Sequence, residues 1–193
     1  MQRVLGFLQD HGVETELIRP VDYAIKFGVT SDEGDGDEWP QVLERVKAAQ
    51  ILLMGTSIWF GHRNSVAQMV IERLDGTYEE RNDQGQYPLY NKVAGVVVTG
   101  NEDGAHSCAE SLLFNLTHLG CTVPPNADTY WVGTAGPGPS YLDAGGEEHP
   151  YTQRTSSWCA HNLLHMARIL RASPIPPIGN TLGEHGGDAV HGG

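Results

Sequence analysis

Aromatic and amide side chains follow two apolar runs of this chain, at positions where they could hold a flat ligand. Trp59 and Phe60 come soon after the run Ile51–Met54, and Asn101 comes soon after the run Val93–Val98. Two large aromatic side chains in a polar loop are costly unless something covers them, and a planar ring system would do so. Asn101 offers both a hydrogen-bond donor and an acceptor, which suits the uracil-like edge of a flavin.

These loops also have plainer interpretations. Trp59 could plug a sheet edge or form a dimer contact. The second loop, Thr99–His106, could simply begin a helix with Asp103 as its N-cap. Its glycines, Gly100 and Gly104, would let the backbone approach a ligand closely. Both interpretations stay open on these residues alone.

The spacing of apolar residues predicts alternating helices and strands. The continuous apolar runs are typical of strands buried on both faces. Helices are expected at Arg3–His11, from Asp37 or Glu38 onwards, and at Ser65–Leu74, Ala105–Leu119 and Thr155–Arg171. Strands are expected at Val13–Ile18, Ile51–Met54, Val93–Val98 and Thr129–Val132. This order implies an α/β fold with a parallel sheet covered by helices on both sides.

Ligands bind outside the carboxyl ends of the strands in such a sheet. That rule selects three loops, at Gly55–Arg63, Thr99–His106 and Gly133–Tyr141. Residues 1–173 are expected to form one domain, and residues 174–193, which are rich in Pro and Gly, are expected to be a disordered tail.

Composition excludes some functions. The formal net charge is -12, with 12 Lys and Arg against 24 Asp and Glu, which argues against a nucleic-acid partner. No apolar run approaches the roughly 18 residues of a membrane span. The three cysteines form no disulfide framework or CxxC motif, and no signal peptide is recognisable. We therefore expect a cytoplasmic protein.

Three other groups of residues invite a chemical interpretation. The acidic segment Ser31–Glu38 does not match a calcium loop, because Leu43 stands twelfth from Asp32 where Glu is needed; we expect a solvated loop. Cys159, His161 and His165 lie on one predicted helix, with the two histidines at i, i+4 spacing, and could make half a metal site. The H-E-x-x-H pattern is absent, so a surface or interface pair is favoured.

A hydrolase site is the third possibility. Ser57 lies in a predicted strand–turn–helix with Asp103 and His106 as conceivable partners. However, Trp59 stands where the nucleophile elbow needs Gly, which argues against hydrolysis.

Two stretches of the chain resemble flavodoxin-like NAD(P)H-dependent FMN reductases. The string GTSIWFGHRNSVAQMVIERLDG is similar to the family's third strand, flavin loop and following helix, where T-P-x-W/Y is usual. The string KVAGVVVTGNEDGAHSCAESLLFNLTHLGCTVPPNADTYWVG is similar to its fourth strand, second flavin loop, helix and fifth strand. The resemblance covers roughly residues 2–172 and implies a flavodoxin-like three-layer sandwich.

The resemblance also implies a cofactor, FMN, and the residues that bind it. Backbone groups of the first loop and residues of the second would contact the isoalloxazine ring, and Trp59 would flank it. The implied cofactor-binding residues are Ser57, Ile58, Trp59, Phe60, Gly61, Thr99, Gly100, Asn101, Glu102 and Asp103.

The chain departs from the family pattern in two places. Ser57 stands where the family often has Pro. More seriously, the family begins with a strand and a Ser/Thr/Gly-rich phosphate loop, whereas this sequence starts inside the helix that follows them. The missing strand would be central, between Val13–Ile18 and the strand beginning at Ile51. We expect an internal or truncated start, a closing-up of the neighbouring strands, or another chain in the gap.

The functional expectation follows from the resemblance. It is an FMN-dependent oxidoreductase that takes hydride from NADH or NADPH and passes it to a quinone-like or other small-molecule acceptor. Arg63 is a candidate for contacting an NADPH 2′-phosphate. Related reductases are often homo-oligomers. The alternative is a flavodoxin-like remnant without FMN, which would act through a dimer or partner interface formed by Trp59 and Phe60.

Overall fold

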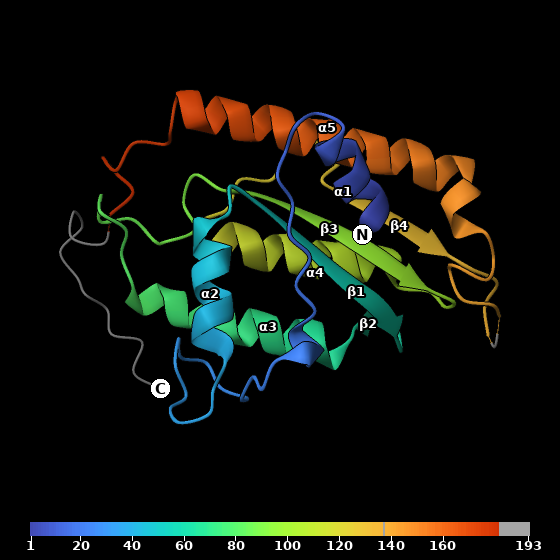
Figure 1. Ribbon diagram of the computed structural model, residues 1–193, viewed down its shortest axis with the longest axis horizontal. Coiled ribbons are helices and arrows are strands. Elements are labelled where there is room, and N and C mark those ends of the chain that lie inside the picture. Colours follow the sequence, from blue (N-terminus) through green and yellow to red (C-terminus); the bar gives the residue numbers. More distant parts are fainter. Residues whose placement is uncertain (137, 182–193) are drawn as a thin grey trace.

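The structure is a computed structural model that describes residues 1–136 and 138–181. Within these residues a sheet with strand order β2-β1-β3-β4 forms the middle layer (Figure 1). Its strands are β1 (Ile51–Trp59), β2 (His62–Arg63), β3 (Val93–Gly100) and β4 (Asp128–Val132). β1, β3 and β4 are parallel, and β2 pairs antiparallel with the end of β1.

β3 is the centre of the sheet. All residues of Val93–Val98 are buried, and the strand pairs with β1 on one side and β4 on the other. Because both faces are covered by helices, both alternating sets of side chains must be apolar. This confirms the strand predicted from the continuous apolar run.

Helices cover both faces of the sheet (Figure 1). α1 (Gln2–Gln9) and α5 (Pro150–Ala172) lie on one face, where Val4, Leu8 and Leu163 pack with β3. α2 (Trp39–Ala48), α3 (Ser65–Asp75) and α4 (Ala105–His118) lie on the other. Three short 3₁₀ turns, η1 (Pro20–Asp22), η2 (Gly76–Glu79) and η3 (Gly146–Glu148), complete the described elements. The predicted three-layer α/β architecture is confirmed.

The predicted strand Val13–Ile18 is wrong. These residues have no strand assignment and no ladder partner. The neighbouring edge of β1 is also open among the described residues, because β2 pairs only with Ile58 and Trp59. Ile51–Met54 is accordingly half-buried, not fully buried as predicted. A strand needs a neighbour for its backbone N–H and C=O groups, and the two segments have not closed up to supply one.

Two predicted boundaries also differ from the structure. β1 continues to Trp59, five residues beyond its apolar run, because β2 turns back and pairs with its end. α5 begins at Pro150, earlier than predicted, with the proline in its first turn, where it loses no helical hydrogen bond.

The start of the predicted tail contacts the rest of the domain. Gln86 Nε2 donates to the carbonyl oxygens of Ile175 and Pro176, each at 3.2 Å, and the Ile175 N–H donates to Asn91 Oδ1 at 2.7 Å. Residues 182–193 lie outside the described residues, so the disorder expected there stays a prediction.

The acidic loop is held by a buried ion pair, which the sequence pattern did not indicate. Arg73 on α3 donates to Asp37 Oδ2 at 2.6 Å, and both side chains are fully buried. Arg73 also donates to the carbonyl oxygens of Lys26 and Thr30. Burial alone would raise the pKa of Asp37, but the hydrogen bonds from Arg73 and from backbone N–H groups hold it well below its usual value. The pair ties the loop to the helix layer.

We predict that Asp37→Asn lowers the free energy of unfolding by about 3 kcal/mol, because it leaves the Arg73 charge buried without a partner. The measurement is urea unfolding at neutral pH. Since the folded-state pKa is lowered, the stabilisation is present above the unfolded pKa of about 4 and is lost as pH falls below it. Asp35→Asn, an exposed change in the same loop, is the control. Equal stability of the two variants would contradict the prediction.

Candidate functional site

The hairpin between β1 and β2 holds two aromatic rings out at the carboxyl edge of the sheet. Trp59 pairs with His62, so Phe60 and Gly61 form a two-residue turn. Both turn residues have positive φ, 50° and 79°, as tight hairpins of the primed types require. A bulky residue rarely adopts this conformation. Trp59 is 62% exposed and Phe60 90% exposed. Burial of these rings within the chain therefore does not offset the backbone strain at Phe60.

The second loop is attached to this hairpin. The Phe60 N–H donates to Glu102 Oε1 at 2.9 Å. Gly104, at φ 121°, lies so close to the hairpin that a Cβ atom there would be 2.4 Å from the Gly61 carbonyl oxygen. Gly100 meets the Ile58 side chain in the same way, at 2.8 Å. Gly100 and Gly104 therefore allow the second loop to pack closely against the end of β1 and its hairpin.

The third loop joins through Asn101. Its Nδ2 donates to the carbonyl oxygens of Gly138 and Pro139, at 2.9 and 3.0 Å. Trp131, on β4, makes an edge contact with Tyr141, with ring centroids 5.5 Å apart. The three loops selected by the sheet topology thus meet at one rim, and Trp59 and Asn101 belong to it.

The predicted binding residues occupy this rim in different ways. Ile58 is buried, so its side chain is not available to a ligand. Ser57 Oγ accepts hydrogen bonds from Trp59 Nε1 and Asn64 Nδ2, at 3.1 and 2.9 Å. No base among the described residues contacts it, and these residues do not assemble the hydrolase site considered from sequence. Thr99 and Gly100 are half-buried at the end of β3, and Asp103 is exposed.

A row of hydrogen-bonded side chains beside the rim was not predicted from the sequence. Tyr151 donates to the Tyr130 hydroxyl at 3.1 Å, and the latter lies 3.2 Å from His106 Nε2. The hydrogen bond with Tyr151 and partial burial raise the pKa of Tyr130 to about 12. Its phenol therefore stays protonated at neutral pH. Only the position of His106 in a predicted loop could have pointed to this group.

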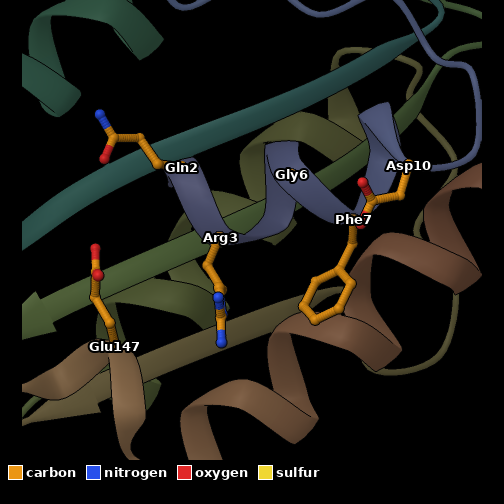
Figure 2. A pocket seen from close by; sticks show the side chains of 6 residues that line it. All are labelled: Gln2, Arg3, Gly6, Phe7, Asp10 and Glu147. Carbon is orange, nitrogen blue, oxygen red and sulfur yellow. The ribbon is translucent and has the colours of Figure 1, made fainter.

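A separate hollow of about 230 Å³ lies along α1 (Figure 2). Arg3 and Phe7 point from α1 towards α5, and Glu147 comes from η3. Asp10 adds a second acid to the lining. The mixture of charges does not favour a phosphate, and we assign no ligand to this hollow.

The fold and the rim define a flavodoxin-like α/β protein. The model of the family described as NADPH-dependent FMN reductase matches residues 1–135. The chain therefore belongs to the NADPH-dependent FMN reductase family. The described residues contain no helix long and apolar enough to cross a membrane.

Individual relatives give more detail. The 8-demethyl-8-aminoriboflavin-5'-phosphate synthase of Streptomyces davaonensis is 38% identical over 183 residues, which cover 90% of this chain and 71% of that protein. The crystal structure of RosB with bound 8-demethyl-8-formylriboflavin-5'-phosphate has a TM-score of 0.82 at 38% identity, covering 90% of this chain and 74% of that one.

A third relative is much longer than this chain. The divalent metal cation transporter MntH of Mycobacterium bovis is 44% identical over 178 residues, which cover 89% of this chain. The match covers 26% of that protein, so this chain spans about a quarter of its length.

FMN is the flavin named in the description of the family to which this chain belongs. The rim fits its ring, because Trp59 and Phe60 are exposed rings on a strained hairpin that no described side chain covers. For the phosphate, residues 1–193 contain no Ser/Thr/Gly-rich loop leading into α1.

We predict that Glu102→Ala increases the hydrogen-exchange rate of the Phe60 amide. The expected increase is about tenfold, which corresponds to the ~1.4 kcal/mol of one hydrogen bond to a charged group. Amide exchange followed by NMR measures it. Glu102→Gln, which keeps an acceptor oxygen, should show a smaller increase. An unchanged Phe60 rate in the alanine variant would show that Glu102 does not hold the hairpin.

Proposed function

We propose that this protein is an FMN-dependent NAD(P)H oxidoreductase that passes hydride from a nicotinamide to the flavin and on to a quinone-like or other small acceptor. The observation that carries the proposal is the rim itself. Two exposed aromatic rings and an amide-anchored loop lie together at the carboxyl edge of a flavodoxin-like sheet, and the family match points to the same chemistry.

The chain's own residues would bind and orient the ring. Trp59 would flank it, and backbone groups of Ser57–Gly61 and Thr99–Asp103 would meet its polar edge. The Asn101 side-chain NH₂ group donates hydrogen bonds to two carbonyl oxygens of the third loop. The remaining Oδ1 is an acceptor, suited to the N–H of a uracil-like edge. Asn101 would therefore act partly by holding the third loop in place.

Bound FMN would supply the two-electron redox chemistry between the nicotinamide and the acceptor. The protein needs no acid–base pair for this. It must hold the ring, leave one face open to the nicotinamide, and admit the acceptor afterwards.

Several partner predictions go with this proposal. The choice between NADH and NADPH stays open, because the Arg63 guanidinium is engaged by Gln68 and Asn115 and is poorly placed to receive a 2′-phosphate as well. Homo-oligomerisation and a cytoplasmic location stay predictions.

A second function is favoured by one specific comparison. The 38% identity and TM-score of 0.82 relate this chain to a protein crystallised with a riboflavin-5'-phosphate derivative changed at position 8, and a synthase of such a derivative is 38% identical. In that case the flavin would be the substrate, held at the same rim, and not a resident hydride carrier.

The first experiment separates these functions. Purified protein is incubated with FMN, NADH or NADPH, and a quinone, and both nicotinamide absorbance and flavin mass are followed. We expect nicotinamide oxidation with unchanged FMN mass. A changed flavin mass without nicotinamide oxidation would favour the flavin-modifying function. Failure to bind FMN would favour the remnant.

The second experiment tests the ring contact. We expect Trp59→Ala to weaken FMN binding about tenfold, because a stacked aromatic contact contributes roughly 1.4 kcal/mol. Flavin fluorescence titration gives the dissociation constant. Trp158→Ala is the matched control, since Trp158 is also about half-exposed, at 48%, but lies on α5. If Trp59→Ala and Trp158→Ala weaken FMN binding equally, the flavin ring does not stack on Trp59.

A further inference from the structure

We propose that His11 and His161 form a binding site for a divalent transition-metal ion such as Zn²⁺ between α1 and α5. The two imidazoles come from different elements: His11 lies just after α1, and His161 lies within α5. Their ring centroids are 4.6 Å apart, and the ring planes are nearly perpendicular, at 81°. Both residues are exposed to solvent.

Hydrogen bonds determine which nitrogen of each ring is free. His11 Nδ1 lies 2.8 Å from the Phe7 carbonyl oxygen, and His161 Nδ1 lies 2.7 Å from the Ser157 carbonyl oxygen. A carbonyl oxygen can only accept, so each Nδ1 must carry a hydrogen and donate it. In the neutral rings the lone pair is therefore on Nε2, and the described residues provide no hydrogen-bond partner for either Nε2.

This arrangement leaves Nε2 of each ring available to a metal ion. Metal-binding histidines almost always donate the other ring N–H to a carbonyl or carboxylate, which fixes the tautomer and the ring orientation. In this protein each carbonyl belongs to the residue four positions earlier on the same helical segment, Phe7 for His11 and Ser157 for His161. Backbone carbonyl oxygens thus already hold the Nδ1 side of both rings.

The ring separation also fits one shared ion. Two imidazoles on one Zn²⁺, with Zn–N bonds of about 2.1 Å and angles from square to tetrahedral, place their centroids about 4.5 to 5.2 Å apart. The observed 4.6 Å lies within this range. A shared ion requires that the Nε2 lone pairs of both rings point to one position between them.

The ligand set indicates the kind of ion. Imidazole nitrogens favour Zn²⁺, Cu²⁺ and Ni²⁺ over Mg²⁺ and Ca²⁺. Among the described residues, no third His, Cys, Asp or Glu joins the pair in a cluster, so water would complete the coordination. The net charge of -12 favours the approach of a cation. Because the site needs α1 docked on α5, the ion would stabilise the folded state.

The sequence spacing had suggested a different pair. His161 and His165 are four residues apart on α5, but His161 makes its ring contact with His11, which is 150 positions away in the chain. Cys159, the other candidate ligand, is buried against the Ala127 carbonyl. The site does not depend on FMN binding or on the proposed function.

The test is calorimetric titration of Zn²⁺ into the untagged full chain after EDTA treatment. It compares wild type with His11→Gln, His161→Gln and the control His165→Gln, an exposed change one turn further along α5. We expect saturable binding and a Zn²⁺-dependent rise in Tm for wild type and the control. Both effects should be lost in His11→Gln and in His161→Gln.

Unchanged Zn²⁺ binding in His11→Gln and His161→Gln, or no binding by wild type, would overturn the proposal. Circular dichroism and Tm in EDTA show whether each variant is folded. If a variant does not fold, imidazole NMR signals of the wild type decide. Zn²⁺ should shift the ring signals of His11 and His161 together, and a shift of only one ring, or of neither, would reject a shared site.

Discussion

The parallel pairing of β3 with both β1 and β4 is the constraint on which the site depends. β3 is buried on both faces, and its register places Ser57 beside Thr99 and Gly100 beside Val132. Parallel strands end at the same edge of a sheet, so the loops that follow them must meet there. The Glu102 bond to the hairpin and the Asn101 bonds to the third loop then fix contacts that the sheet has already made possible.

The rim contains a strained hairpin that residues from the neighbouring loop stabilise. Phe60 is held at positive φ with its ring in solvent, which costs free energy in the chain alone. Glu102 offsets part of this by accepting the Phe60 N–H, and the absence of Cβ atoms at Gly100 and Gly104 lets the loops pack closely. In the proposed function, a flavin that covers the two rings would offset the rest of this cost. This is why the family's FMN and the exposed hairpin support each other.

Much of the fold could be predicted, and the exceptions have physical causes. The strand Val93–Val98 was recognisable because burial on both faces requires a continuous apolar run. Val13–Ile18 alternates like a strand, but it has no neighbouring strand. An isolated segment cannot satisfy its backbone groups as a ladder. The same missing neighbour leaves Ile51–Met54 half-buried. Asp37 was interpreted as part of a solvated loop because its partner, Arg73, is 36 residues away.

By itself, the sequence determined the alternation of helices and strands, the order of the loops at the carboxyl edge and the residue types available there. Those features depend on local periodicity and on the rule that parallel strands share an edge. Only the tertiary structure decided which partners these residues take: Asn101 with the third loop, Arg63 with Gln68 and Asn115, and His161 with His11. Side-chain partners depend on distances between segments far apart in the chain, and no local pattern encodes those distances.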